Sequence, residues 1–111
     1  MIKTSIIVSL QYEAVHCWPG CSIEEVSFLR YPHRHLFYIT LEKEVGHSDR
    51  DVEIICFKRK VYEYLDKKYS HDFESLSCEM VSQELLTKFD CLSVMVLEDN
   101  ENGGRVYRSM V

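Results

Sequence analysis

The chain has 111 residues and a formal net charge of -5, with 46% hydrophobic and 28% charged residues. That length suits one domain with one core, so residues 1–111 are expected to form a single domain. The negative charge argues against nucleic acid as a partner, because phosphate binding needs a clustered basic surface, and the lack of a long apolar run argues against a membrane span.

The first predicted element is a long β-strand over residues 2 to 16, where apolar and polar side chains alternate. His16 has the parity of the apolar set and therefore ends the face that we expect to be buried. Residues 17 to 32 contain two prolines and one glycine and show no sustained period. They predict a loop that is longer than a simple hairpin requires.

The second predicted strand covers residues 33 to 45 and ends at Gly46. His33 and His35 are two residues apart, so they share one strand face with the apolar residues that follow. If the two strands pair antiparallel, the end of the first strand meets the start of the second, and His16 joins the other two histidines at one corner of the sheet.

Three converging imidazoles with one open position are the ligand set of a catalytic zinc site, and we therefore predict Zn²⁺ bound by His16, His33 and His35. Two other interpretations of the same residues stay open. Either the three rings are core histidines with ordinary hydrogen bonds, or they belong to a structural zinc site with a fourth protein ligand from Cys17 or Cys21.

The middle of the chain predicts two helices. A short apolar run over residues 52 to 56 is compatible with an extended segment, and residues 57 to 69 then repeat apolar side chains at intervals of three and four. Residues 70 to 76 break this pattern. A second helix is predicted over residues 78 to 89, with Ser77 as its N-cap.

Residues 91 to 98 alternate again and end at Glu98, residues 99 to 104 predict a turn, and residues 105 to 111 predict a last short strand. The helices therefore lie in the middle of the order strand, strand, helix, helix, strand, strand. This order indicates an α+β fold with a four-stranded antiparallel sheet, ββααββ. An open sheet of this kind has exposed edges that another copy of the chain can cover.

The cysteines indicate the compartment. Their number is odd, none forms a CxxC pair, and the sequence opens with Met-Ile-Lys rather than with a signal peptide. These observations fit reduced thiols better than a disulfide framework, so we expect a cytoplasmic protein. The five positions are Cys17, Cys21, Cys56, Cys78 and Cys91.

Four segments carry motifs in a recognisable order. They are Tyr12 to His16 (aromatic-x-Ala-x-His), His33-Arg34-His35 before a hydrophobic strand, Ser77-Cys78-Glu79 at a helix start, and Val94 to Glu98 at a strand end. Together they resemble the 6-pyruvoyl-tetrahydropterin synthase family, which includes the 6-carboxy-tetrahydropterin synthases of 7-deazaguanine (queuosine) biosynthesis. The likeness covers nearly the whole chain.

The resemblance implies a tunnelling fold, a zinc ion held by the three histidines, and a pterin ring anchored by Glu98 through the ring's amino and N3 hydrogens. It also implies a lyase that acts on 7,8-dihydroneopterin triphosphate or a related dihydropterin. Family members assemble as trimers or hexamers, so the resemblance implies a homo-oligomer here. A carboxylate suits the assigned role of Glu98, because it accepts two parallel hydrogen bonds in one plane.

The sequence departs from the family pattern at the proton-transfer residues. The family's catalytic cysteine precedes the His-Gly-His motif by a few residues, but here Cys21, further upstream, is the main candidate. The family's Asp-His pair is replaced by Ser70-His71, so His71 is the candidate proton carrier and its orienting acid is either lost or moved to Asp72. The alternative function is a zinc protein of the same fold that binds a pterin or purine without turnover.

Overall fold

The two longest strands form the centre of the sheet. The computed structural model describes residues 1–109, and in it β1 (Thr4–His16) and β2 (His33–Val45) pair antiparallel along their whole length. Thr4 lies opposite Val45 at one end of the pair, and His16 lies opposite His33 at the other. Alternating burial along both strands confirms the parity on which the predicted strand faces depended.

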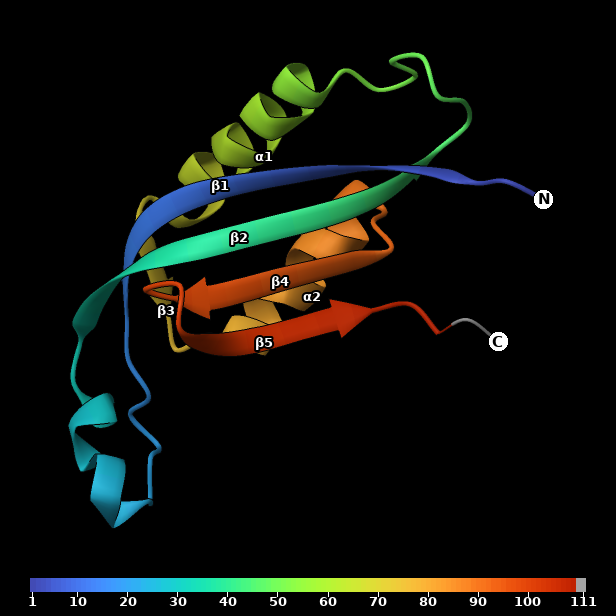
Figure 1. Cartoon of the computed structure of the whole chain (residues 1–111). Helices are drawn as coiled ribbons and strands as arrows, with labels where there is room; N and C mark the ends of the chain where they lie inside the picture. The colour runs from blue at the N-terminus through green and yellow to red at the C-terminus, as the bar shows by residue number, and fades with distance from the viewer. Residues whose placement is uncertain (110–111) are drawn as a thin grey trace.

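Three shorter strands complete a five-stranded mixed sheet with the order β3-β1-β2-β4-β5 (Figure 1). β4 (Ser93–Glu98) pairs antiparallel with β2, and β5 (Asn102–Tyr107) pairs antiparallel with β4. β3 (Asp72–Glu74) pairs with the end of β1 in parallel. The α+β class is therefore confirmed.

The predicted four-stranded antiparallel sheet differs from the observed one in its extra strand. β3 comes from residues 70–76, which the sequence pattern marked only as a break, because three residues are too few for a visible alternation. The last strand begins earlier than expected, at Asn102, and ends at Tyr107. The final two residues of the predicted strand over 105 to 111 lie outside the described residues.

Two helices pack on one face of the sheet. α1 (Ile54–Tyr69) lies against β1, and α2 (Cys78–Phe89) lies against β4 and β5. The short run at 52 to 56 is not a strand, since α1 begins inside it after the Glu53 side chain accepts hydrogen bonds from the first turn. Ser77 caps α2 as predicted, because its hydroxyl accepts a hydrogen bond from the Met80 amide.

The core lies between the helices and the inward faces of β1, β2 and β4. Its fully buried members include aromatic, leucine, isoleucine and valine side chains: Tyr12, Phe37, Ile39, Leu41, Val61, Leu65, Phe73, Val81, Leu85, Val94 and Val96. Along the same inward face, the apolar side chains give way to histidines at the end of β1 and the start of β2.

The segment between β1 and β2 projects beyond the sheet (Figure 1). The predicted loop contains a 3₁₀ segment, η1 (Glu24–Arg30), which has no buried residue. Large apolar side chains in and around it are exposed, namely Trp18, Ile23, Phe28 and Tyr31. Among residues 1–109, no helix is long and apolar enough to cross a membrane.

Candidate metal centre

The pairing of β1 with β2 brings three histidines together. His16 and His33 are direct partners across the two strands, and His35 lies opposite Ala14, two residues before His16. One potential ligand atom from each histidine lies within 4.8 Å of the others, and the ring centroids are 4.6 to 5.3 Å apart. The predicted convergence is confirmed, and the three rings (the histidine triad) lie close enough to bind a metal ion.

Main-chain carbonyls orient two of the three rings. Nδ1 of His33 lies 2.8 Å from the Tyr31 carbonyl oxygen, and Nδ1 of His16 lies 3.4 Å from the Leu76 carbonyl oxygen. A carbonyl oxygen only accepts, so Nδ1 of each ring carries the proton and donates it. In a neutral ring this leaves the lone pair on Nε2, which is the usual arrangement of a metal-binding histidine.

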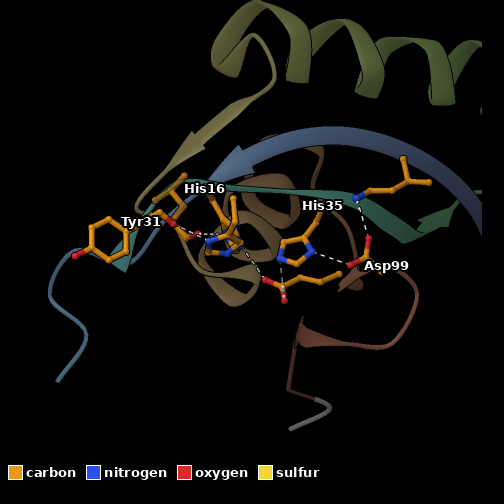
Figure 2. A network of polar contacts seen from close by, with 8 residues as sticks. His16, Tyr31, His35 and Asp99 are labelled. Carbon is orange, nitrogen blue, oxygen red and sulfur yellow. Dashed lines mark hydrogen bonds and ion pairs between the residues drawn. The ribbon is translucent and has the colours of Figure 1, made fainter. Parts of the chain in front are cut away.

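A carboxylate orients the third ring. Nδ1 of His35 lies 2.7 Å from Oδ2 of Asp99, whose Oδ1 accepts a hydrogen bond from the Leu36 amide at 3.1 Å. Figure 2 shows Asp99 on the side of His35 that faces away from His16. The hydrogen bond from His35 is the main cause of the lowered pKa of the Asp99 carboxyl. This carboxylate–histidine pair is typical of metal sites.

Asp99 was not predicted as a site residue, because in the sequence it belongs to a turn over residues 99 to 104. Only the strand register of the structure places Asp99, since Glu98 at the end of β4 lies opposite Phe37 on β2. The next residue is therefore at the level of Leu36, beside His35. Asp99 also has a positive φ of 54°, a backbone conformation that residues other than glycine seldom adopt outside tight turns.

The facing nitrogens of the triad lack hydrogen bonds. Within the described part of the chain, Nε2 of His16 and Nε2 of His33 are buried and have no hydrogen-bond partner. Burial lowers the pKa of His16, which favours the neutral ring that binds metal ions. Buried polar atoms in proteins are rarely left without a partner, so these two atoms fit ligands of a cation.

Glu98, the last residue of β4, lies against the triad. Its Oε2 is 3.0 Å from Nε2 of His16, and its Oε1 is 3.7 Å from Nε2 of His35. The 3.0 Å contact lacks the alignment of a hydrogen bond, since Nε2 of His16 has no hydrogen-bond partner among residues 1–109. The side chain is 28% exposed, so it is partly withdrawn from water beside the predicted metal position.

The cysteines predicted as base or fourth ligand are not part of this cluster. Among residues 1–109, the group of potential metal ligands holds the three histidines and no cysteine. Cys21 is buried in the projecting segment, where its thiol lies 3.7 Å from the carbonyl oxygens of Ile23 and Val26. Cys17 is half-buried just after β1. The structure therefore gives no fourth ligand from either cysteine.

His71 belongs to a second cluster on β1 and α1. Its Nε2 lies 3.2 Å from Oδ1 of Asp66, and its Nδ1 lies 2.6 Å from the Glu13 carbonyl oxygen. The acid beside His71 is thus Asp66 of α1, whereas Asp72 accepts a hydrogen bond from the amide of Glu74. Sequence spacing could not reveal Asp66, because only the packing of α1 on β1 brings it to His71.

Tyr12 holds this second cluster together. Its ring stacks on the His71 ring with centroids 4.5 Å apart. Its hydroxyl donates to Asp66 at 3.0 Å and accepts from the His71 amide at 2.9 Å. Burial raises the pKa of Tyr12 to about 12. We call Tyr12, Asp66 and His71 the tyrosine cluster; along β1, Tyr12 is four residues, or about 13 Å of extended strand, from His16.

The contacts within this single chain are enough to form the triad and to orient its three rings. Each ring has an acceptor at Nδ1, and the three rings meet within the distance that one metal ion spans. No model of a known protein family matches the chain, and no curated protein sequence matches it.

Proposed function

We propose that the protein is a zinc-dependent lyase of the pterin-synthase type. The favoured form is a 6-carboxy-tetrahydropterin synthase of the 7-deazaguanine pathway, acting in the cytoplasm on 7,8-dihydroneopterin triphosphate or a related dihydropterin. The observation that carries the proposal is the histidine triad, in which each Nδ1 meets an acceptor and the remaining nitrogens face one another. Five cysteines without a disulfide are compatible with the cytoplasm.

The triad supplies the metal-binding part of this function. His16, His33 and His35 would hold Zn²⁺ through Nε2, while the Tyr31 and Leu76 carbonyls and the Asp99 carboxylate keep the rings in place. When bound, the metal supplies Lewis-acid polarisation of the vicinal hydroxyls on the substrate side chain. Neutral imidazoles suit this role, and the burial of His16 favours its neutral form.

Glu98 and His71 are the proposed binding and proton-carrying residues. The Glu98 carboxylate is partly buried beside the triad, where it can accept two hydrogen bonds from an aminopyrimidinone edge. His71 has an imidazole that can carry a proton, and Asp66 is its acidic neighbour at 3.2 Å. Cys21 has less support as a base, because its thiol faces carbonyl groups of its own segment.

We propose a tunnelling fold that closes by assembly of a trimer or hexamer. Two features support the assembly. β5 is an edge strand of the sheet, and an edge presents unpaired backbone groups to another strand. The projecting segment exposes Trp18, Phe28 and Tyr31, which are 45%, 64% and 68% accessible in the single chain.

A second candidate is a protein that binds a pterin or purine without turnover. The tyrosine cluster favours it, because both ring nitrogens of His71 contact groups of the chain itself, Asp66 and the Glu13 carbonyl, instead of being left for a substrate. The position of Cys21 also favours the binding protein. Its thiol lies outside the triad's ligand group and contacts the Ile23 carbonyl, so it does not provide a base beside the metal position.

One experiment separates the two candidates. Zinc-loaded protein is incubated with 7,8-dihydroneopterin triphosphate, and products are followed by chromatography with His33→Ala as the control. A new pterin product with wild-type protein alone supports the lyase. Saturable pterin binding without product supports the binding protein, and neither product nor binding would exclude both.

A further inference from the structure

The Glu98 carboxylate contacts two rings of the triad through two different oxygens. Oε2 lies 3.0 Å from Nε2 of His16, and Oε1 lies 3.7 Å from Nε2 of His35. Both rings are oriented by acceptors at Nδ1, so their Nε2 atoms are the ones that point toward the carboxylate. Glu98 thus lies against two of the three imidazoles, and a turn of its side chain would bring one oxygen into the group of facing nitrogens.

These contacts have the spacing of neighbouring ligands around one metal ion. In a tetrahedral zinc site with metal–ligand distances near 2.0–2.1 Å, adjacent ligand atoms are roughly 3.3 Å apart. The two observed separations, 3.0 Å from Oε2 to His16 and 3.7 Å from Oε1 to His35, lie on either side of that value, with one carboxylate oxygen beside each ring. A hydrogen bond does not explain the shorter contact, because Nε2 of His16 has no hydrogen-bond partner in the described residues.

A cation between the groups would explain why they lie so close. With its proton on Nδ1, a neutral ring turns the lone pair of Nε2 toward the carboxylate, and two electron-rich atoms then face each other. A metal ion placed between them converts this repulsion into two coordinate bonds. Carboxylate oxygen and imidazole nitrogen are both ordinary zinc ligands.

We propose that Glu98 is the fourth and displaceable ligand of the metal held by the histidine triad. The proposal rests on the metal site of the proposed function and adds a state to it. Without substrate, the Glu98 carboxylate occupies the fourth position on the metal. A substrate with two adjacent oxygens displaces the carboxylate, whereas a ligand with a single weak oxygen does not. The displaced carboxylate is then free to hold the ring edge of the substrate.

The position of Glu98 allows this movement. It is the last residue of β4, and Asp99 and Asn100 follow it with positive φ angles in a tight turn. The strand and the Asp99–His35 hydrogen bond fix the backbone, while the side chain remains 28% exposed. The side chain can therefore turn outward while the rings of the triad stay in place.

Cobalt-loaded protein and azide test the proposal directly. Azide binds an accessible metal position, and the visible spectrum of Co²⁺ reports the change of ligand. We expect weak azide binding to wild-type protein and at least about tenfold tighter binding to Glu98→Ala and Glu98→Gln, because neither variant offers a carboxylate. Zinc affinity should fall by about ten- to a hundredfold in Glu98→Ala, as measured by competition with a chromogenic chelator.

Glu101→Ala is the matched control, since Glu101 is an exposed acid of the same turn. It should behave as wild type in both measurements. Equal azide affinity in wild type, Glu98→Ala and Glu98→Gln would overturn the proposal while leaving the triad intact, provided that His33→Ala loses the metal. If His33→Ala keeps one metal per chain, the metal site itself fails and the proposal fails with it.

Discussion

The histidine triad and the tyrosine cluster use the same side chain in opposite ways. In both, Nδ1 lies within 3.4 Å of an acceptor, which is a carbonyl or a carboxylate oxygen. In the triad, the Nε2 atoms of His16 and His33 are buried and have no hydrogen-bond partner among residues 1–109. In the tyrosine cluster, Nε2 of His71 faces Asp66. Both second nitrogens of His16 and His71 thus lie near a carboxylate, but that of His16 is buried beside two other imidazoles, whereas the His71 side chain is 50% exposed.

The difference also divides β1 into two parts. The contacts around Tyr12 stabilise the strand, because the Tyr12 hydroxyl pairs with the Asp66 carboxylate and the His71 amide, and the Tyr12 ring stacks on the His71 ring. At His16 the strand buries a polar atom without a partner, which costs free energy unless a ligand arrives. We therefore expect changes at the triad to alter metal binding and changes at the tyrosine cluster to alter stability.

The largest effect is expected from His33→Ala. This change removes one of three imidazoles, so the protein should go from about one Zn²⁺ per chain to nearly none, as measured by metal analysis after dialysis. His47→Ala is the control, because His47 lies in an exposed turn beside Asp51. Full zinc content in His33→Ala would remove the distinction between the two clusters.

A smaller loss of metal affinity is expected from Asp99→Ala. The change leaves all three imidazoles but removes the acceptor at Nδ1 of His35, so the ring loses its fixed orientation and tautomer. Zinc affinity should fall by about ten- to a hundredfold in a chelator competition. Asp49→Ala changes an exposed acid far from the triad in sequence and should have no effect. An unchanged affinity in Asp99→Ala would mean that the acceptor is dispensable.

Tyr12→Phe should change stability and leave zinc affinity unchanged. Without the hydroxyl, Asp66 loses a donor and the His71 amide loses its acceptor, so the free energy of unfolding should fall by about 1–3 kcal/mol in urea titrations. A matched fall in zinc affinity would show that the two clusters are coupled, contrary to this expectation.

The same tyrosine predicts a dependence on alkaline pH. Its pKa is raised from 10.0 to about 12 by burial, so the unfolded chain releases this proton at lower pH than the folded chain does. The contribution of Tyr12 to stability is thus complete below pH 10 and is lost as the pH rises toward 12. Over this range, wild-type stability should fall more steeply than that of Tyr12→Phe, and parallel curves would contradict the assignment.

The smallest effect is expected from Tyr31→Ala. The acceptor for Nδ1 of His33 is the main-chain carbonyl of residue 31, and the tyrosine ring itself is 68% exposed. Zinc affinity should therefore be the same in this variant and in wild type, in contrast to Asp99→Ala. A clear loss of affinity would show that the exposed ring, and not only the backbone, supports the site.

Strand parity predicted most of the triad and its surroundings. The alternation that ends at His16 and begins at His33 was visible in the sequence, and the observed β2 (His33–Val45) matches its predicted range. α2 also matches its predicted range, because both its capping serine and its apolar stripe are local signals. Properties that depend on residues close together in the chain could therefore be predicted from the sequence.

Contacts between distant segments were not accessible in this way. Asp66 meets His71 only because α1 packs on β1, and nothing in the spacing of the two residues indicates it. Asp99 reaches His35 only through the register of β4 on β2. Cys21 was predicted to be near the triad, but the loop that contains it has no period from which its position could be inferred. In the structure its thiol contacts carbonyl oxygens of its own segment.

Because His16 pairs directly with His33, metal binding by the triad would be linked to the folding of the hairpin. A slip of one residue between β1 and β2 would turn one of these rings to the opposite face of the sheet, so a misaligned hairpin lacks the complete ligand set. A metal ion that binds only the aligned form stabilises it in proportion to the logarithm of the ion's concentration over its dissociation constant. Metal ions present during synthesis would then favour chains in which β1 and β2 pair in the correct register.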